Sequence, residues 1–210
     1  MKHYLICTLC LLASISLLGQ EKAPVQRQLG LWGGIGAGQY INVTDNSRSP
    51  LGGRMMLWTV AANYDRRIKE SNWLVRYQLG FSRRPQPAIS SKFHYLSSSF
   101  SFLHRSKRDF LIGLGLQVSR VFVYVHEEYR DGYTLENNDF ELAIPLLLEK
   151  QFVLNERLSL HATIKGDISA TAIIPRFCTA SPTNPTRSNC YHFFSESVFA
   201  GVGIKYDLGR

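Results

Sequence analysis

Apolar and polar residues alternate with a period of two along most of the chain. In the segment 192–208, one face carries large apolar side chains, namely Val198, Ala200, Val202, Ile204, Tyr206 and Leu208. The other face carries Phe199, Gly201, Gly203, Lys205 and Asp207. Similar alternation marks eight segments, 29–41, 53–67, 73–83, 92–105, 109–126, 139–152, 157–173 and 192–208. Period two is typical of strands, and no segment keeps a 3.6-residue period with helix caps, so the pattern predicts an all-β fold.

The connections between these segments alternate in length. Short polar joints lie at 68–72, 105–108 and 154–156, and long ones at 42–52, 84–91, 127–138 and 174–191. This sorting is typical of an up-and-down barrel, whose tight turns gather at one end and whose long loops gather at the other. A two-sheet sandwich has no reason to sort its loops in this way. We therefore predict an eight-stranded antiparallel up-and-down barrel.

Composition distinguishes the inside of this barrel from the outside. One face is small or charged, with glycines at 34, 36, 38, 113, 115, 201 and 203 and with Arg76, Glu141, Glu149, Lys165, Asp167, Lys205 and Asp207. Eight strands enclose space for side chains but not for a wide channel, and charges can fill it if they pair. The large apolar face would then contact lipid. Near strand ends it carries the aromatic residues expected at a membrane interface: Trp58, Tyr64, Trp73, Phe81, Tyr124, Phe152 and Tyr206.

The N-terminus has the three parts of a secretory signal peptide. A short basic start is followed by the apolar run 4–18, by Gly19 and by the polar residues 20–22. The run is shorter than the roughly 20 residues of a membrane-spanning helix. We predict a cleaved signal peptide over 1–19, a periplasmic lead over 20–28 and a barrel over 29–210.

Cleavage changes the cysteine and charge counts. Cys7 and Cys10 leave with the signal, and Cys178 and Cys190 remain as a predicted disulfide that pins a loop. Loss of Lys2 lowers the formal net charge from +8 to +7. A basic exported protein can meet anionic lipid headgroups or acidic glycans. The 12% aromatic and 19% charged content excludes a disordered chain.

These features together resemble the small eight-stranded outer-membrane barrels of the OmpA/OmpX type, among the porin-family β-barrel domains of Gram-negative envelopes. The final strand adds Gly203, Tyr206 and Leu208, similar to the family's assembly signal of a glycine followed by alternating bulky residues. Two departures are the extension through Gly209-Arg210 and Gly201 where a polar residue is usual. The resemblance implies the outer membrane as location, insertion by the barrel-assembly machinery, and contact with outer-membrane lipids and lipopolysaccharide.

Motifs that could carry chemistry are few. The glycines at 34, 36 and 38 lie inside a strand, whereas a phosphate-binding loop needs a strand–turn–helix context. His126-Glu127-Glu128 has ligand types suited to a divalent cation, but it is better explained as a solvated rim. Lipid A deacylases of this fold use an outward histidine two residues before a serine, whereas His161 and Thr163 lie on the inward face. We therefore predict no catalytic residues, metal or cofactor, and keep a lipid A hydrolase as the enzymatic alternative.

The loops are the remaining candidates for function. The segment 174–191 and its neighbour offer Arg176, Arg187, Tyr191 and His192 as contacts for a protein or glycan partner. We predict a structural or interaction role through four long external loops, without a wide pore and without nucleic acid. A soluble lipocalin-like carrier of a hydrophobic ligand is the other alternative, because Gly30-Leu31-Trp32 matches the short first-strand pattern of that family.

Overall fold

The computed structural model describes residues 27–42, 48–51, 57–69, 71–86, 91–106, 108–125, 133–135, 140–169, 177–181, 184–191 and 193–209. The predicted signal peptide over 1–19 lies outside these residues. So does the predicted lead over 20–28, except for its last two residues, because β1 begins at Arg27.

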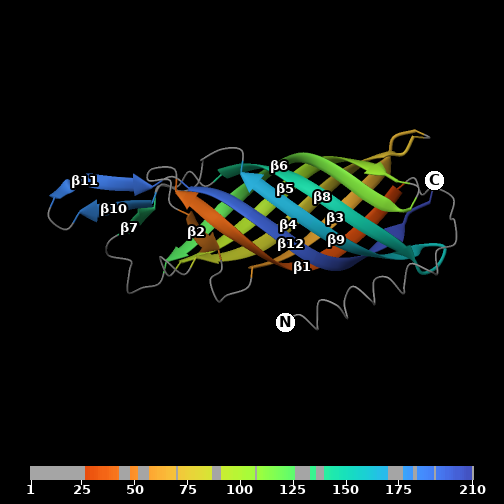
Figure 1. Cartoon of the computed structure of the whole chain (residues 1–210), viewed down its shortest axis with the longest axis horizontal. Helices are drawn as coiled ribbons and strands as arrows, with labels where there is room; N and C mark the ends of the chain where they lie inside the picture. Colours follow the sequence, from red (N-terminus) through yellow and green to blue (C-terminus); the bar gives the residue numbers. More distant parts are fainter. Residues whose placement is uncertain are drawn as a thin grey trace.

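Eight long strands form a closed antiparallel barrel (Figure 1). They are β1 (Arg27–Asn42), β3 (Leu57–Arg67), β4 (Trp73–Gln86), β5 (Ser91–Arg105), β6 (Phe110–Val125), β8 (Phe140–Val153), β9 (Leu158–Ser169) and β12 (Phe193–Asp207). Each pairs with its neighbour in the chain, and β12 closes the barrel on β1 from the pair Gln28–Asp207 to the pair Asn42–Phe193. The predicted fold class is confirmed.

The turns and the long connections separate to opposite ends. The turns after β3, β5 and β8 lie at the end that also holds the C-terminus (Figure 1). In the first of them, Ile68 N donates to Trp73 O over 2.9 Å. We call this end the turn end and the opposite one the loop end.

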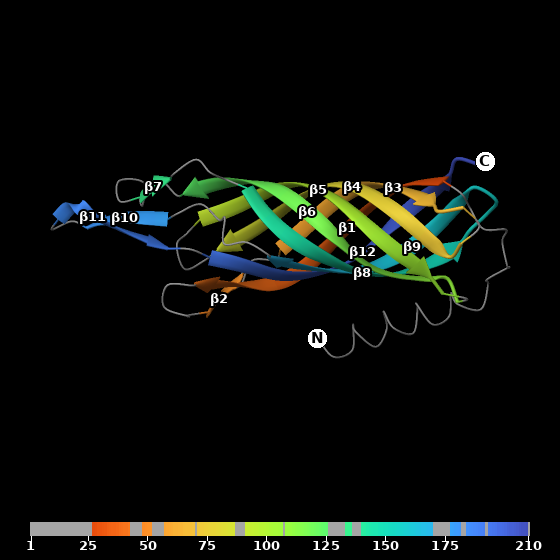
Figure 2. The ribbon, with the colours of Figure 1, turned by 90° about the horizontal axis from the view of Figure 1, so that it is seen from above.

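Four short strands at the loop end were not predicted. β2 (Arg48–Leu51) pairs with β1, while β7 (Tyr133–Leu135), β10 (Phe177–Ser181) and β11 (Asn184–Tyr191) form a separate three-stranded sheet. This sheet projects beyond the barrel (Figures 1 and 2). The prediction of plain loops over 42–52, 127–138 and 174–191 was therefore wrong in part. The period-two signal identifies strands with one apolar face, and sequences such as Phe-Cys-Thr-Ala-Ser lack it.

Side chains on the barrel wall alternate between the interior and the outer surface. In β9, Ile164 is 50% exposed, whereas its neighbours Thr163 and Lys165 are buried. The outward apolar residues form a band over the whole wall, including Leu31, Leu79, Leu114, Leu146 and Val202. Such an extended apolar surface is far larger than the patches that soluble monomers expose. No helix within the described ranges is long and apolar enough to cross a membrane.

Candidate functional site

A cluster of paired charges lies inside the barrel toward the turn end. Arg76 donates two hydrogen bonds to Asp65, from Nε to Oδ1 over 2.7 Å and from Nη2 to Oδ2 over 2.8 Å. Its Nη1 also lies 2.9 Å from Glu149 Oε2. Lys205 Nζ bonds both Asp65, over 2.7 Å, and Glu149. All four side chains are at least 99% buried, so each charge is neutralised only by its partners in the barrel.

A second cluster fills the interior toward the loop end. Arg84 Nη2 lies 3.1 Å from Asp167 Oδ2, and Lys165 Nζ lies 3.0 Å from Asp167 Oδ1. The Arg84 guanidinium also stacks 4.1 Å above the ring of Tyr95. Glu141 Oε1 accepts a hydrogen bond from Ser195 Oγ over 2.7 Å.

The interior charges balance. Among the described residues, the buried ionic side chains besides His161 are four acids and four bases, namely Asp65, Glu141, Glu149, Asp167, Arg76, Arg84, Lys165 and Lys205. Burying charge is costly unless it is paired, and equal numbers allow pairing without excess. The described interior is therefore filled by paired charges together with buried apolar side chains such as Leu103 and Phe199.

The sequence predicted six of these eight residues inside the barrel and missed Asp65 and Arg84. Asp65 shares its face with Thr59 and Ala61, so strand alternation alone could have placed it inside. Arg84 was missed because its strand was predicted to end at 83, whereas β4 continues to Gln86. Asp207 follows Lys205 on the inward face of β12, but it is only partly buried, because β12 ends there at the turn-end rim. Its Oδ1 accepts a hydrogen bond from Gly209 N over 2.9 Å.

His161, Thr163 and Glu149 come together as a constellation of catalytic residue types. His161 Nδ1 lies 3.0 Å from Thr163 Oγ1 and 3.3 Å from Glu149 Oε2. However, His161 is 1% exposed and Thr163 is 2% exposed. His161 Nε2 packs against the backbone at Gly203, where a Cβ would approach it to 2.5 Å. A nucleophile must be within reach of the substrate, so this arrangement is a hydrogen-bonded part of the core.

Two of the four predicted loop contacts belong to the projecting sheet. Cys178 in β10 is directly opposite Cys190 in β11 in the antiparallel register. Arg187 and Tyr191 lie on β11, whereas Arg176 and His192 lie outside the described residues. The divalent-cation site that the sequence analysis considered at His126-Glu127-Glu128 also lies outside the described residues. Within the described part of the chain, no three His, Cys, Asp or Glu side chains gather in a way that could hold a metal ion.

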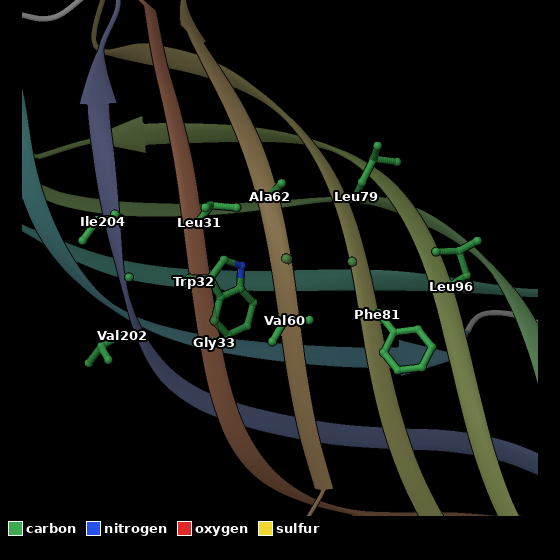
Figure 3. A pocket seen from close by; sticks show the side chains of 13 residues that line it. Leu31, Trp32, Gly33, Val60, Ala62, Leu79, Phe81, Leu96, Val202 and Ile204 are labelled. Atoms are coloured by element: carbon green, nitrogen blue, oxygen red, sulfur yellow. The ribbon is translucent and has the colours of Figure 1, made fainter.

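The outer wall carries a shallow apolar depression of about 620 Å³ across β12, β1, β3, β4 and β5 (Figure 3). Its outward floor is formed by Gly33 and Ala62, the two small residues among large ones. Its rims are Leu31, Val60, Leu79, Phe81, Leu96, Val202 and Ile204. The volume is within the range of small-molecule sites, and the lining is almost wholly apolar.

Comparisons with known proteins agree with the fold. No protein-family model matches the sequence, and no curated protein matches it. Among solved structures, the outer membrane protein OprG from Pseudomonas aeruginosa matches with a TM-score of 0.50 and 11% identity, over 86% of this chain and 96% of that one. Neisserial surface protein A matches with a TM-score of 0.48 and 11% identity, over 86% and 97% of the two chains. The chain is thus similar in fold to small eight-stranded outer-membrane barrels.

Proposed function

We propose that this protein is an outer-membrane barrel with a closed interior, which acts through the sheet of β7, β10 and β11 at its loop end. The observation that carries this proposal is the distribution of side chains, which is the reverse of that in a soluble barrel. Apolar side chains cover the outside, and paired charges fill the inside. In water the apolar band would be exposed, whereas in a bilayer it contacts acyl chains and every strand is paired, as a spanning structure requires.

The projecting sheet supports an interaction role. It extends the barrel at the end opposite the turns (Figure 2), which suits contact with a protein or glycan outside the cell. Directly opposed cysteines in antiparallel strands lie within the Cα separation that a disulfide needs, so we propose that Cys178 and Cys190 are bonded. A gain of two hydrogens in mass on reduction of the purified protein checks this bond, and an unchanged mass contradicts it.

Two other functions receive less support. A lipid A hydrolase of the proposed kind needs its histidine and hydroxyl on the outer surface, and here His161 and Thr163 are buried. A soluble lipocalin-like carrier needs an apolar interior, and here the interior holds ion pairs. Both arguments favour a role carried by the loop end.

Labelling of intact cells tests the proposal. A peptide epitope inserted between Ser181 and Asn184, at the connection between β10 and β11, is expected to bind antibody on intact cells. The matched control is the same epitope inserted after Asn155 in the turn that follows β8, which is expected to bind antibody only after the outer membrane is permeabilised. An epitope at 181–184 that stays hidden until permeabilisation, or equal labelling of both insertions, would contradict the proposal.

A further inference from the structure

Basic side chains gather on the outer wall near the loop end. Arg83 in β4 is opposite His94 in β5, and His94 is opposite Phe122 in β6. Arg120 lies two residues from Phe122, opposite Leu96. The sequence neighbours of these residues on the described strands are buried, so Arg83, His94 and Arg120 face outward. We call these three residues the outer-wall cluster.

Aromatic rings frame the outer-wall cluster. Phe81 lies 5.5 Å from His94 and 5.6 Å from Trp58, measured between ring centroids. The Arg120 guanidinium lies 5.2 Å from the centre of the Phe122 ring. Girdles of aromatic residues flank the apolar band of outer-membrane barrels at the level of the lipid headgroups.

The arginines of the outer-wall cluster are positioned to share a ligand. β4 and β6 are two strand spacings apart, about 10 Å, which two arginine side chains can bridge from opposite sides. Arg83 Nε is shielded from solvent and has no hydrogen-bond partner among the described residues. Among the outward positions of β3, β4, β5 and β6 whose burial the structure describes, none is Asp or Glu, and the fixed charges are arginines. A second copy of this face would therefore meet like charges, whereas an anion would be attracted.

The apolar depression begins directly beside the outer-wall cluster. Phe81 and Leu96 line the depression, and Arg83 and His94 are two residues farther toward the loop end on the same strands. Figure 3 shows Phe81 and Leu96 at one side of the depression and Val202 and Ile204 at the other. The outer-wall cluster thus lies next to the apolar depression on the outward face of the barrel wall.

We propose that this surface binds a phosphate-bearing, acylated lipid of the outer leaflet. Arg83 and Arg120 hold the phosphate, and one acyl chain lies in the depression over Gly33 and Ala62. Arginine matches phosphate oxygens with paired hydrogen bonds, and basic pockets between membrane segments bind anionic headgroups. The inference rests on the proposed membrane location.

Native mass spectrometry of the folded protein in detergent tests the phosphate contact, with diphosphoryl lipid A and fully dephosphorylated lipid A as probes. Wild type is expected to prefer the diphosphoryl probe. Arg83→Gln/Arg120→Gln is expected to weaken binding of that probe about tenfold or more, because two charge-assisted contacts are lost. The matched control is Arg27→Gln/Arg66→Gln, an outward arginine pair at the turn end, which should bind like wild type. Equal loss in both variants, or no loss in the first, would overturn the proposal.

A second variant tests the acyl contact. Gly33→Leu places a branched side chain on the floor of the depression, where its Cβ meets its nearest atoms at 3.7 Å. It is expected to weaken binding of both probes, and unchanged binding of both would overturn the acyl placement. Slower migration of each protein after boiling than before, on a detergent gel, establishes the barrel beforehand. A folded barrel without phosphate preference would refute the lipid site alone, whereas a protein that forms no barrel in detergent would refute the proposed function.

Discussion

Arg76→Met is expected to lower the free energy of unfolding by about 3–5 kcal/mol. Arg76 is 1% exposed and contacts both Asp65 and Glu149. Without it, two buried carboxylates share the single ammonium of Lys205, and one negative charge remains uncompensated inside the barrel. Removal of one partner from a buried ion pair costs far more than the pair contributes, because the other charge cannot reach water.

Denaturant titration of the protein folded in detergent measures this loss of unfolding free energy. Two further variants show whether the loss comes from the unpaired charge. Arg66→Met removes an exposed arginine on the outer wall and should change stability by no more than about 0.5 kcal/mol. Asp65→Asn/Arg76→Met restores the charge balance and should be more stable than Arg76→Met alone. A double variant that is less stable than the single one would show that charge balance does not hold this core together.

Gly113→Ala is expected to destabilise the barrel by about 1–3 kcal/mol through overpacking. Gly113 faces inward on β6, directly opposite Leu103 on β5. A Cβ at this position would overlap the carbonyl oxygen of Phe102 and approach Leu103 Cδ2 to 2.5 Å. Leu103 is completely buried in a cluster with Leu74, Leu111 and Leu147, so it has no space to yield. The strands themselves would have to move apart.

Gly33→Ala is the matched control, since it makes the same chemical change on the outward face of β1. A Cβ there has its nearest neighbours, Thr59 O and Val60 Cγ1, at 3.7 Å. This variant should keep or raise stability, because alanine restricts the unfolded chain more than glycine does. The migration of unboiled samples on a detergent gel and denaturant midpoints measure both variants. Equal destabilisation by the two substitutions would argue against close packing at Gly113.

The sequence supported the prediction of the barrel because its two faces differ so strongly in chemistry. Alternation in segments such as 192–208 identified the strands, and the sorting of short and long connections indicated closure. The pairing of the interior charges could not be predicted from the sequence, because pairs such as Arg84 with Asp167 join residues 83 positions apart. Their contact depends on the register of strands around the barrel, which local patterns do not specify.

The candidate sites were less predictable for a different reason. The projecting sheet has strands of largely polar sequence, such as Asn184–Tyr191, in which apolar and polar residues do not alternate, so the period-two pattern does not mark them. The outer-wall cluster was missed because Arg83, His94 and Arg120 lie on different strands, and each alone looks like a residue at the solvent rim. Only the registers of β4, β5 and β6 bring them to the edge of the apolar depression.

Tryptophan quenching by brominated acyl chains tests this reversed distribution of side chains in the barrel most directly. The chain has three tryptophans: Trp58 and Trp73 face outward at the loop end and the turn end, and Trp32 is buried inside. In vesicles of brominated phospholipid, wild type is expected to be strongly quenched. The Trp58→Phe/Trp73→Phe variant, which emits from Trp32 alone, is expected to be quenched much less. Wild type without quenching, or a variant quenched as strongly as wild type, would contradict a barrel with its apolar face in lipid.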